Sequence, residues 1–589
     1  MVEKIHQTLR DSKAARWTAL AVVAFTMLCG YFLTDVMAPL KPMLEKELLW
    51  TNSEYGLFTS AYGWFNVFLL MLIFGGIILD KMGVRFTGLG ACTLMVIGCA
   101  IKYGAVSGFI PLEGVVFAGT QFEMKTMVAV AALGYAIFGV GVEIAGITVS
   151  KIIVKWFKGK EMALAMGLEM ATARLGTMLA MSVTVPFAKA FSSLSAPILL
   201  CLIMLCIGLI AFVVYTFMDK KLEASIGKEA VASEEDSFRL NDIWVIITNK
   251  GFWLIALLCV LFYSAVFPFL KYATDLMVNK YAVDPEFAGI IPSLLPLGTL
   301  FLTPFFGNLY DRKGKGATIM IIGALMLIGV HLLFALPLLN YWWFATIIMI
   351  VLGVAFSLVP SAMWPSVPKI IPEKQLGTAY ALIFWVQNWG LMGVPYLIGI
   401  LLDITNPGVG DIKKDLTNRI ENQFGQSITQ LDSLNNNLKN QADAYLCEFT
   451  SIEDTTAFSA EHKNTVFVQK YTNKLFVGID SNYQKLLLNY STSDARATQI
   501  ALILAEIDQF QILAKDSTVI IPEGYFPLAQ QMKEELAGIE KIQDSTIYNY
   551  TIPMVVFSLF GILALIVAFM LKIEDKKKGY GLELPNIQK

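Results

Sequence analysis

The chain has 589 residues, of which 56% are hydrophobic and only 16% charged, and its mean hydropathy is +0.61. This composition is too apolar for a water-soluble protein of that length and indicates an integral membrane protein. The net charge of −2 argues against nucleic acid as a partner.

Twelve apolar segments are long enough to cross a bilayer, which takes about 20 residues. In chain order they lie near 17–40, 55–79, 86–103, 127–149, 162–187, 197–217, 252–269, 287–309, 319–339, 342–360, 378–402 and 552–571. No small-residue cleavage site follows the first segment, so we expect a retained span and not a removed signal peptide. The segments predict an all-α membrane protein built from two pseudo-symmetric six-helix bundles.

Charged and polar stretches set the expected domain boundaries. The N-terminal bundle is predicted at 1–218, a cytoplasmic linker at 219–250, helices 7–11 at 251–403, helix 12 at 549–573 and a cytoplasmic tail at 574–589. Clusters of lysine and arginine near 4–16, 81–85, 151–160, 220–228, 312–315 and 576–578 all fall on one side of such a topology. Because basic loops stay in the cytoplasm, both termini are predicted to be cytoplasmic.

A polar insertion at 404–548 separates helices 11 and 12 and is expected on the extracytoplasmic face. It is long enough to form a small domain. Apolar residues recur at threes and fours from Ile420 to Tyr445, which predicts an amphipathic helix, and a second helix is expected over 485–514. We expect a helical hairpin or bundle that covers the mouth of the pore or contacts an unknown protein.

Two short turns between apolar runs repeat the same pattern. Gly76-Ile-Ile-Leu-Asp80-Lys81-Met-Gly83 and Gly307-Asn-Leu-Tyr-Asp311-Arg312-Lys-Gly314 share Gly, Asp and Gly at one offset, since 307−76, 311−80 and 314−83 all equal 231. Short loops favour Gly, Asp and Lys in any protein. A repeat at the same place in both halves nevertheless indicates a transporter built from two similar bundles. Conformational roles in gating are expected for Gly76, Asp80, Gly83, Arg85, Asp311 and Arg312.

Two charges lie inside predicted spans, where each costs roughly 2.5–3.5 kcal/mol on insertion scales. Glu143 lies 15 residues before Lys158, and Arg174 lies 15 residues after Gly159. If the fourth and fifth spans turn at Lys158-Gly159, both charges stand about 23 Å from the turn, at one depth in the membrane. They could bind the two ends of a zwitterion, or they could form a structural ion pair. The spacing alone leaves both interpretations open.

Further polar and aromatic residues could line a cavity, although such residues in spans more often pack or sit at the interface. The candidates are Tyr62, Trp64, Asn66, Tyr263, Trp364 and Gln387. Glu169 and Asp35 could serve proton coupling, while solvation at the interface is an equal alternative for Asp35. His331 is expected to be a packing histidine, and Pro360, Pro365 and Pro368 are expected to break or bend the tenth span.

No enzyme constellation is evident. The three histidines are scattered through tail, span and insertion, which leaves no Ser/His/Asp set, and no phosphate-binding loop is present. Six of the seven cysteines lie in apolar runs, so neither a disulfide framework nor a metal site is predicted. No cofactor is expected.

The repeated Gly-x-x-x-Asp-[Lys/Arg]-x-Gly turn resembles the signature of the major facilitator superfamily. Five further segments resemble its lysosomal dipeptide uniporters: 62–66, 156–176, 265–269, 363–365 and 372–388. The resemblance covers most of the twelve-span core and does not cover the insertion. It implies that Glu143 grips a peptide's amino end, that Arg174 grips its carboxylate, and that transport is uncoupled. Glu169 stands where the animal proteins carry a neutral residue, which leaves proton coupling open.

We therefore predict a dipeptide uniporter working by alternating access in a lipid bilayer, as a monomer or weak homodimer. A bacterial inner membrane is expected, or the lysosomal membrane in a eukaryote. Two other functions remain open at this stage. One is a proton-coupled carrier of a small organic anion, anchored by Arg174 with Glu143 as its proton site. The other is a non-transporting receptor that acts through the insertion.

Overall fold

The computed structural model describes residues 11–120, 123–157, 161–226, 240–337, 339–372, 375–449, 460–513 and 521–585. The turn at Lys158-Gly159 and the acidic part of the linker, 234–236, lie outside the described residues. The chain divides into two compact units, Met1–Thr405 with Asn549–Lys589, and Asn406–Tyr548.

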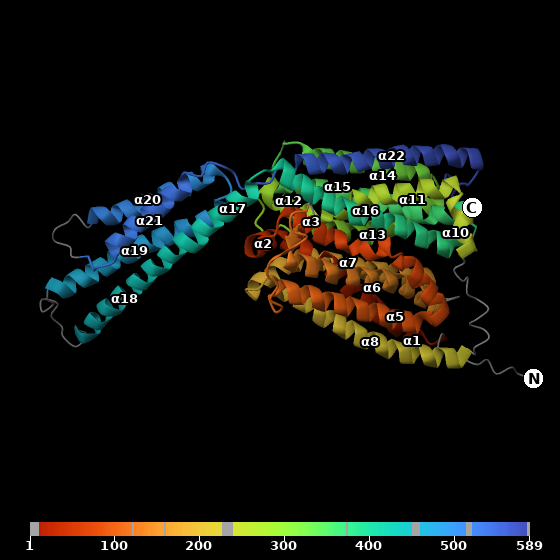
Figure 1. Cartoon of the computed structure of the whole chain (residues 1–589), viewed down its shortest axis with the longest axis horizontal. Coiled ribbons are helices and arrows are strands. Elements are labelled where there is room, and N and C mark those ends of the chain that lie inside the picture. Colours follow the sequence, from red (N-terminus) through yellow and green to blue (C-terminus); the bar gives the residue numbers. More distant parts are fainter. Residues whose placement is uncertain are drawn as a thin grey trace, which may run out of the picture. The chain divides into compact units, whose positions relative to one another are not determined.

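The first unit is helical apart from one short ribbon (Figure 1). Its N-terminal helices are α1 (Lys13–Asp35), α2 (Met37–Leu48), α3 (Asn52–Ser60), η2 (Ala61–Gly63), α4 (Trp64–Phe68), α5 (Met71–Val106), α6 (Thr126–Phe157), α7 (Met162–Ala190) and α8 (Ala196–Ile226). Its C-terminal helices are α10 (Leu240–Ile247), α11 (Lys250–Ser264), α12 (Phe267–Tyr281), α13 (Ile290–Lys313), α14 (Gly316–Ala335), α15 (Trp342–Ile370), α16 (Leu376–Thr405) and α22 (Thr551–Lys578). Strands β1 (Val115–Val116) and β2 (Met124–Lys125) pair antiparallel between α5 and α6.

The helices gather as two groups, as the repeat predicts. In Figure 1 the red-to-yellow helices α1–α8 lie together, and the green helices lie together with the dark blue α22. Within the described residues, ten helical stretches are long and apolar enough to cross a membrane. The end of the second predicted span and the third predicted span share α5, which is kinked at Gly83. The helix α7, over the fifth predicted span, is not among the ten.

The second span was expected to form one helix over 55–79, and this prediction is wrong. It runs as α3, η2 and α4, and it breaks at Leu69 and Leu70, where Leu70 takes φ 53°. The Trp385 indole of α16 donates to the Val67 carbonyl (3.2 Å) beside the break. A side chain from the opposite group therefore satisfies a backbone group there, which is the condition for irregular backbone at membrane depth.

Prolines have different effects in the seventh and tenth spans. The seventh span divides into α11 and α12 at Ala265 and Val266, just before Pro268, and the Ala265 carbonyl is hydrogen-bonded to the His331 Nε2 (2.8 Å). His331 is fully buried against aromatic rings, which confirms its packing role. The three prolines were expected to break or bend the tenth span, and no break occurs, because α15 continues as one helix through all three of them.

The second unit is a set of long helices around its own apolar core. They are α17 (Val409–Thr417), the π-helical η4 (Asn418–Phe424), α18 (Gly425–Phe449), α19 (Ala460–Asn489), α20 (Ser493–Leu513) and α21 (Tyr525–Glu540). Ile420, Phe424 and Ile428 are buried in that core, as the helical periodicity predicts. The single helix expected over 485–514 is wrong, because the chain breaks between α19 and α20. The buried Arg496 side chain donates to the carbonyls of Tyr490, Ile542 and Asp544 at this break.

Candidate functional site

Glu143 lies on α6 with a hydrogen-bond donor beside it. The Tyr62 hydroxyl donates to Oε1 of Glu143 across 2.7 Å, and the Asn388 side chain of α16 also lies next to this carboxylate. A Cβ on Gly139 would stand 2.3 Å from the Tyr62 carbonyl oxygen. Only glycine therefore lets α6 approach the 3₁₀ turn η2 closely enough to make this contact.

Arg174 lies on α7 among aromatic rings. Its guanidinium carbon is 5.8 Å from the ring centre of Tyr31, 5.7 Å from that of Phe267 and 5.4 Å from that of Phe356. These rings come from α1, α12 and α15, hence from both helix groups, and each attracts a cation through its π face. We call the three rings the aromatic cage. A Cβ on Gly176 would stand 2.4 Å from the Leu28 carbonyl oxygen, so a glycine again sets the close crossing, here of α7 with α1.

Glu143 and Arg174 do not neutralise one another. Within the described part of the chain, neither forms an ion pair, and Arg174 has no hydrogen-bonded acceptor. Both side chains are only partly buried. The structural ion pair, one of the two interpretations of the sequence, is therefore not what the structure contains. A guanidinium held by rings alone keeps its N–H donors available for a carboxylate.

Tyr263 and Trp364 extend this site. The Trp364 indole donates to the Tyr263 hydroxyl (3.1 Å), and the Tyr263 ring stacks on the cage residue Phe267 with centroids 5.1 Å apart. Trp364 in turn lies against Phe384, with centroids 5.1 Å apart. The two predicted aromatic residues are thus continuous with the surroundings of Arg174.

Three other candidates make contacts within the helix packing. The fully buried Asn66 amide donates to the Gly139 carbonyl (3.3 Å), and the Trp64 indole donates to the Ser60 hydroxyl (3.1 Å). The Gln387 oxygen accepts from the Cys259 thiol (3.5 Å). Tyr31, Phe356 and the role of Asn388 were not predicted from the sequence. Only Asn388 carried a signal, because it adjoins Gln387 in a segment that resembles the uniporters.

The two candidates for proton coupling differ in their surroundings. Asp35 is buried and pairs with Lys271 of α12, with Oδ1 and Nζ 2.6 Å apart. This contact joins the two helix groups and replaces the solvated state considered for Asp35. Glu169 is partly buried on α7, one and a half turns before Arg174.

The repeated turns share an unusual backbone conformation. Gly83 has φ 76° and Gly314 has φ 68°, while Gly76 and Gly307 lie inside helices with open space around their Cα hydrogens. Asp311 and Arg312 occupy the last turn of α13. We call the end of the unit that carries these turns the motif end, and the end where α16 and α22 join the second unit the insertion end.

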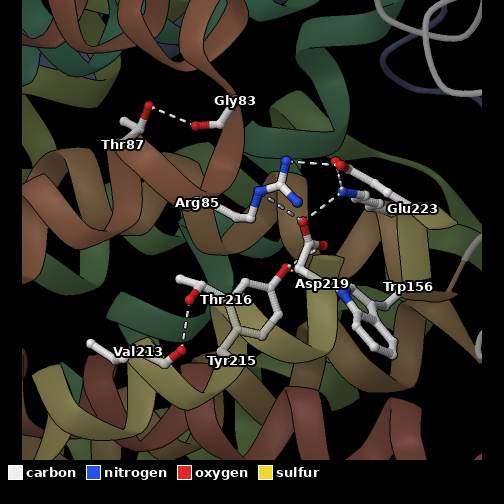
Figure 2. A network of polar contacts seen from close by, with 10 residues as sticks. Gly83, Arg85, Thr87, Trp156, Val213, Tyr215, Thr216, Asp219 and Glu223 are labelled. Carbon is white, nitrogen blue, oxygen red and sulfur yellow. Dashed lines mark hydrogen bonds and ion pairs between the residues drawn. The ribbon is translucent and has the colours of Figure 1, made fainter. Parts of the chain in front are cut away.

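Charge networks connect helices at the motif end. Asp80 pairs with Lys151 of α6 (3.0 Å). Figure 2 shows Arg85 reaching Glu223 (2.8 Å) and Asp219 (3.8 Å) of α8. Lys155 contacts the same two carboxylates at 2.9 Å each, and the Tyr215 hydroxyl also donates to Asp219. Arg85 and Asp80 thus tie helices of the N-terminal group to one another.

The two helix groups, the repeated turns and the charged site between the groups define a membrane transporter. The family model described as Major Facilitator Superfamily matches residues 21–395, and the chain belongs to this superfamily. The resemblance drawn from the repeated turn is thereby confirmed. The protein is an integral, multi-pass membrane protein.

Several curated relatives carry one name. Lysosomal dipeptide transporter MFSD1 of Bos taurus is 28% identical over 406 residues, which cover 66% of this chain and 80% of that protein. The Homo sapiens protein of the same name is 28% identical over 404 residues, with the same coverage. The Gallus gallus protein is 30% identical over 280 residues, covering 46% of this chain and 62% of its own length.

Solved structures support the fold. Two crystal structures of a bacterial homologue of the human lysosomal transporter Spinster, both inward-facing, superpose with TM-scores of 0.55 (unoccupied) and 0.53 (occupied). Sequence identities are 13% and 11%, and each comparison covers 96% of this chain and 98% of the other. At such identities the likeness concerns the fold alone.

Proposed function

We propose that this protein transports dipeptides, or zwitterions of similar size, by alternating access as a uniporter. The observation that carries the proposal is the state of Arg174: a cation among three rings from both helix groups, with no acidic partner in the described residues. The dipeptide transporters among its relatives support the choice of substrate.

Each charge suits one end of a dipeptide. The guanidinium of Arg174 can donate two parallel hydrogen bonds to the terminal carboxylate. The Glu143 carboxylate, oriented by Tyr62, can accept from the terminal ammonium. Binding that removes water from both contacts strengthens them, since the effective dielectric falls. A substrate that holds both charges therefore favours the conformation that closes around it.

The proposed topology has twelve spans, because α5 holds two spans joined by the kink at Gly83 and α7 forms the fifth. Both termini and the motif end face the cytoplasm, following the basic residues near the turns. The insertion end and the unit Asn406–Tyr548 then lie outside the cytoplasm. The side chains that we propose for substrate contact are Glu143, Arg174, Tyr62, Tyr263 and Trp364.

Uptake of a labelled dipeptide into proteoliposomes tests the proposal. We expect Glu143→Gln and Arg174→Lys each to reduce uptake at least tenfold. Arg419 is a partly exposed arginine of the second unit, and Arg419→Lys should leave uptake unchanged. Normal uptake by both site variants would show that the zwitterion site is wrong. Stimulation by an imposed pH gradient would instead favour a proton-coupled carrier, and a protein silent in every flux assay would favour a receptor.

A further inference from the structure

The chain passes between the first unit and the unit Asn406–Tyr548 at two places, and at both of them residues of the first unit form contacts between the two helix groups. We call residues 403–405, which lead into the unit, the N-terminal root, and residues 549–551, which lead out of it, the C-terminal root. A residue of each root is hydrogen-bonded within a contact that joins the two helix groups at the insertion end: Asp403 of the N-terminal root to Asn52, and Tyr550 of the C-terminal root to Asp275. The function proposed above does not explain why the unit is attached at these two places.

The first contact belongs to Asp403, the first residue of the N-terminal root. Its carboxylate accepts from the Asn52 amide (2.9 Å), the Ser53 backbone N–H (2.7 Å) and the Ser53 hydroxyl (2.5 Å). Asn52 and Ser53 begin α3, in the N-terminal group. Close packing reinforces the contact, because a Cβ on Gly399 would stand 2.3 Å from the Asn52 carbonyl oxygen. We call this contact the α3–α16 latch.

The second contact centres on Asp275 of α12. This fully buried carboxylate pairs with Lys41 of α2, with Oδ2 and Nζ 2.7 Å apart, and side chains of both residues are almost inaccessible. The Tyr550 hydroxyl, in the C-terminal root, donates to the same Oδ2 atom. The Asn279 amide donates to Oδ1 (3.1 Å). We call this contact the α2–α12 latch.

Inside the second unit, the two chain ends that continue into the roots are fastened together. The Lys413 ammonium of α17 lies 5.1 Å from the ring centre of Tyr548. A Cβ on Gly410 would lie 3.5 Å from the Tyr548 hydroxyl, so α17 and the last residue of the unit are in contact. The first and last segments of the unit are therefore held together by packing as well as by the chain.

We infer that the unit Asn406–Tyr548 couples the two latches, so that the α3–α16 and α2–α12 contacts break and form together when the insertion end opens and closes. The inference rests on the proposed alternating access, in which the two helix groups must separate at this end. It assigns positioning roles to Asp403, Asp275 and Tyr550. It also implies that a ligand which fixes the unit would hold this end in one state.

Distances between spin labels test the coupling without any transport measurement. Two label pairs share one label at Glu113→Cys in the N-terminal group. In the Pro285 pair the second label is at Pro285→Cys, near α12. In the Ile404 pair it is at Ile404→Cys, near the α3–α16 latch. All three positions are accessible. The background carries Cys206→Ser and Cys447→Ser, and the remaining five cysteines are buried. Each full-length variant is compared by size-exclusion profile before measurement.

We expect Asp403→Asn to raise the open population several-fold at both label pairs. Lys189→Gln is the matched control: Lys189 also joins the groups at the insertion end, through Glu286 (2.9 Å), but lies in neither root, so we expect little change. If Asp403→Asn does not fold, Ser53→Ala removes one bond of the same latch from the opposite side. A flexible Gly-Ser segment inserted between Thr405 and Asn406 should restrict the effect of Asp403→Asn to the Ile404 pair.

Three results would overturn the inference. No opening in either Asp403→Asn or Ser53→Ala means that this contact is not a latch. Opening at the Ile404 pair alone, without the Gly-Ser segment, means that the latches are independent. Opening at both pairs with the segment present means that the bundles, and not the unit, provide the coupling. A variant that opens as expected in a protein without dipeptide uptake would refute the proposed function and leave the coupling standing.

Discussion

The Tyr62 hydroxyl and the Glu143 carboxylate are 2.7 Å apart, and their hydrogen bond joins the interrupted second span to α6. This bond stabilises the ionised carboxylate and fixes its orientation. We expect Tyr62→Phe to weaken dipeptide binding by about 1 kcal/mol or more, which corresponds to a roughly five- to tenfold higher KM for uptake.

The matched control for Tyr62→Phe is Tyr310→Phe. Tyr310 is fully buried, but its hydroxyl has no hydrogen-bond partner in the described structure. Removal of the Tyr310 hydroxyl should leave the KM for dipeptide uptake unchanged. Equal KM values for wild-type protein and Tyr62→Phe would mean that the bond to Glu143 plays no part in substrate binding.

The aromatic cage predicts a second effect on affinity. Phe356→Leu keeps an apolar side chain of similar size but removes one of the three π faces beside Arg174. A cation–π contact contributes about 0.5–2 kcal/mol, so KM should rise about two- to thirtyfold with little change in maximal rate. Phe334→Leu removes a ring that packs on Phe269, away from this cation, and serves as the control. A larger fall in maximal rate than in affinity would place Phe356 in the conformational step.

The two charges are easier to single out from the sequence than the residues around them. Glu143 and Arg174 stand out because charges in apolar spans are costly, and the spacing of the two predicted spans put them at one depth. The cage could not be predicted, since Tyr31, Phe267 and Phe356 come from helices that only tertiary packing brings together. Asn388 was missed for a different reason, because its neighbour Gln387 carries an equal polar signal.

A hydropathy pattern could not predict the backbone irregularities either. The break at Leu69-Leu70 lies in a purely apolar run. The Trp385 indole, which donates to the Val67 carbonyl beside the break, is distant in sequence. The prolines of α15 predicted a break or a bend, and no break occurs there, whereas the seventh span does break before Pro268. In both spans, the neighbouring helices decide whether the freed backbone groups find partners.

The motif turns allow a comparison within one repeat. Gly83 has φ 76° and ψ 172°, a region that essentially only glycine occupies, so Gly83→Ala should cost about 1–3 kcal/mol of stability. Gly76→Ala places a methyl group in open space on a helix and should be neutral or slightly stabilising. The melting temperatures of Gly83→Ala and Gly76→Ala in detergent test this difference. Equal melting temperatures would mean that the kink at Gly83 relaxes without penalty.

The network in Figure 2 predicts unequal roles for its two carboxylates. Asp219 is fully buried and contacts Arg85, Lys155 and Tyr215, whereas the Glu223 side chain is 31% exposed. Asp219→Asn removes the fully buried carboxylate, while Arg85 and Lys155 keep Glu223 as a counter-charge, and should cost about 1–3 kcal/mol. Glu223→Gln should cost about 1 kcal/mol or less. The ranking of melting temperatures tests this difference, and an inverse ranking would contradict the assignment of Asp219 as the centre of the network.

The crossing of α5 with α6 gives a prediction with an internal control on the same helix. A Cβ on Gly98 would stand 2.5 Å from both the Gly134 carbonyl oxygen and the Phe138 amide nitrogen, and these backbone atoms cannot move aside as a side chain can. Gly98→Ala should therefore separate the two helices and cost about 1–3 kcal/mol. Gly90 lies two turns earlier on α5 with nothing within 4 Å, so Gly90→Ala should be tolerated. Because α6 carries Glu143, the separation should also lower dipeptide uptake, and a Gly98→Ala protein with wild-type stability and uptake would show that this contact does not position the site.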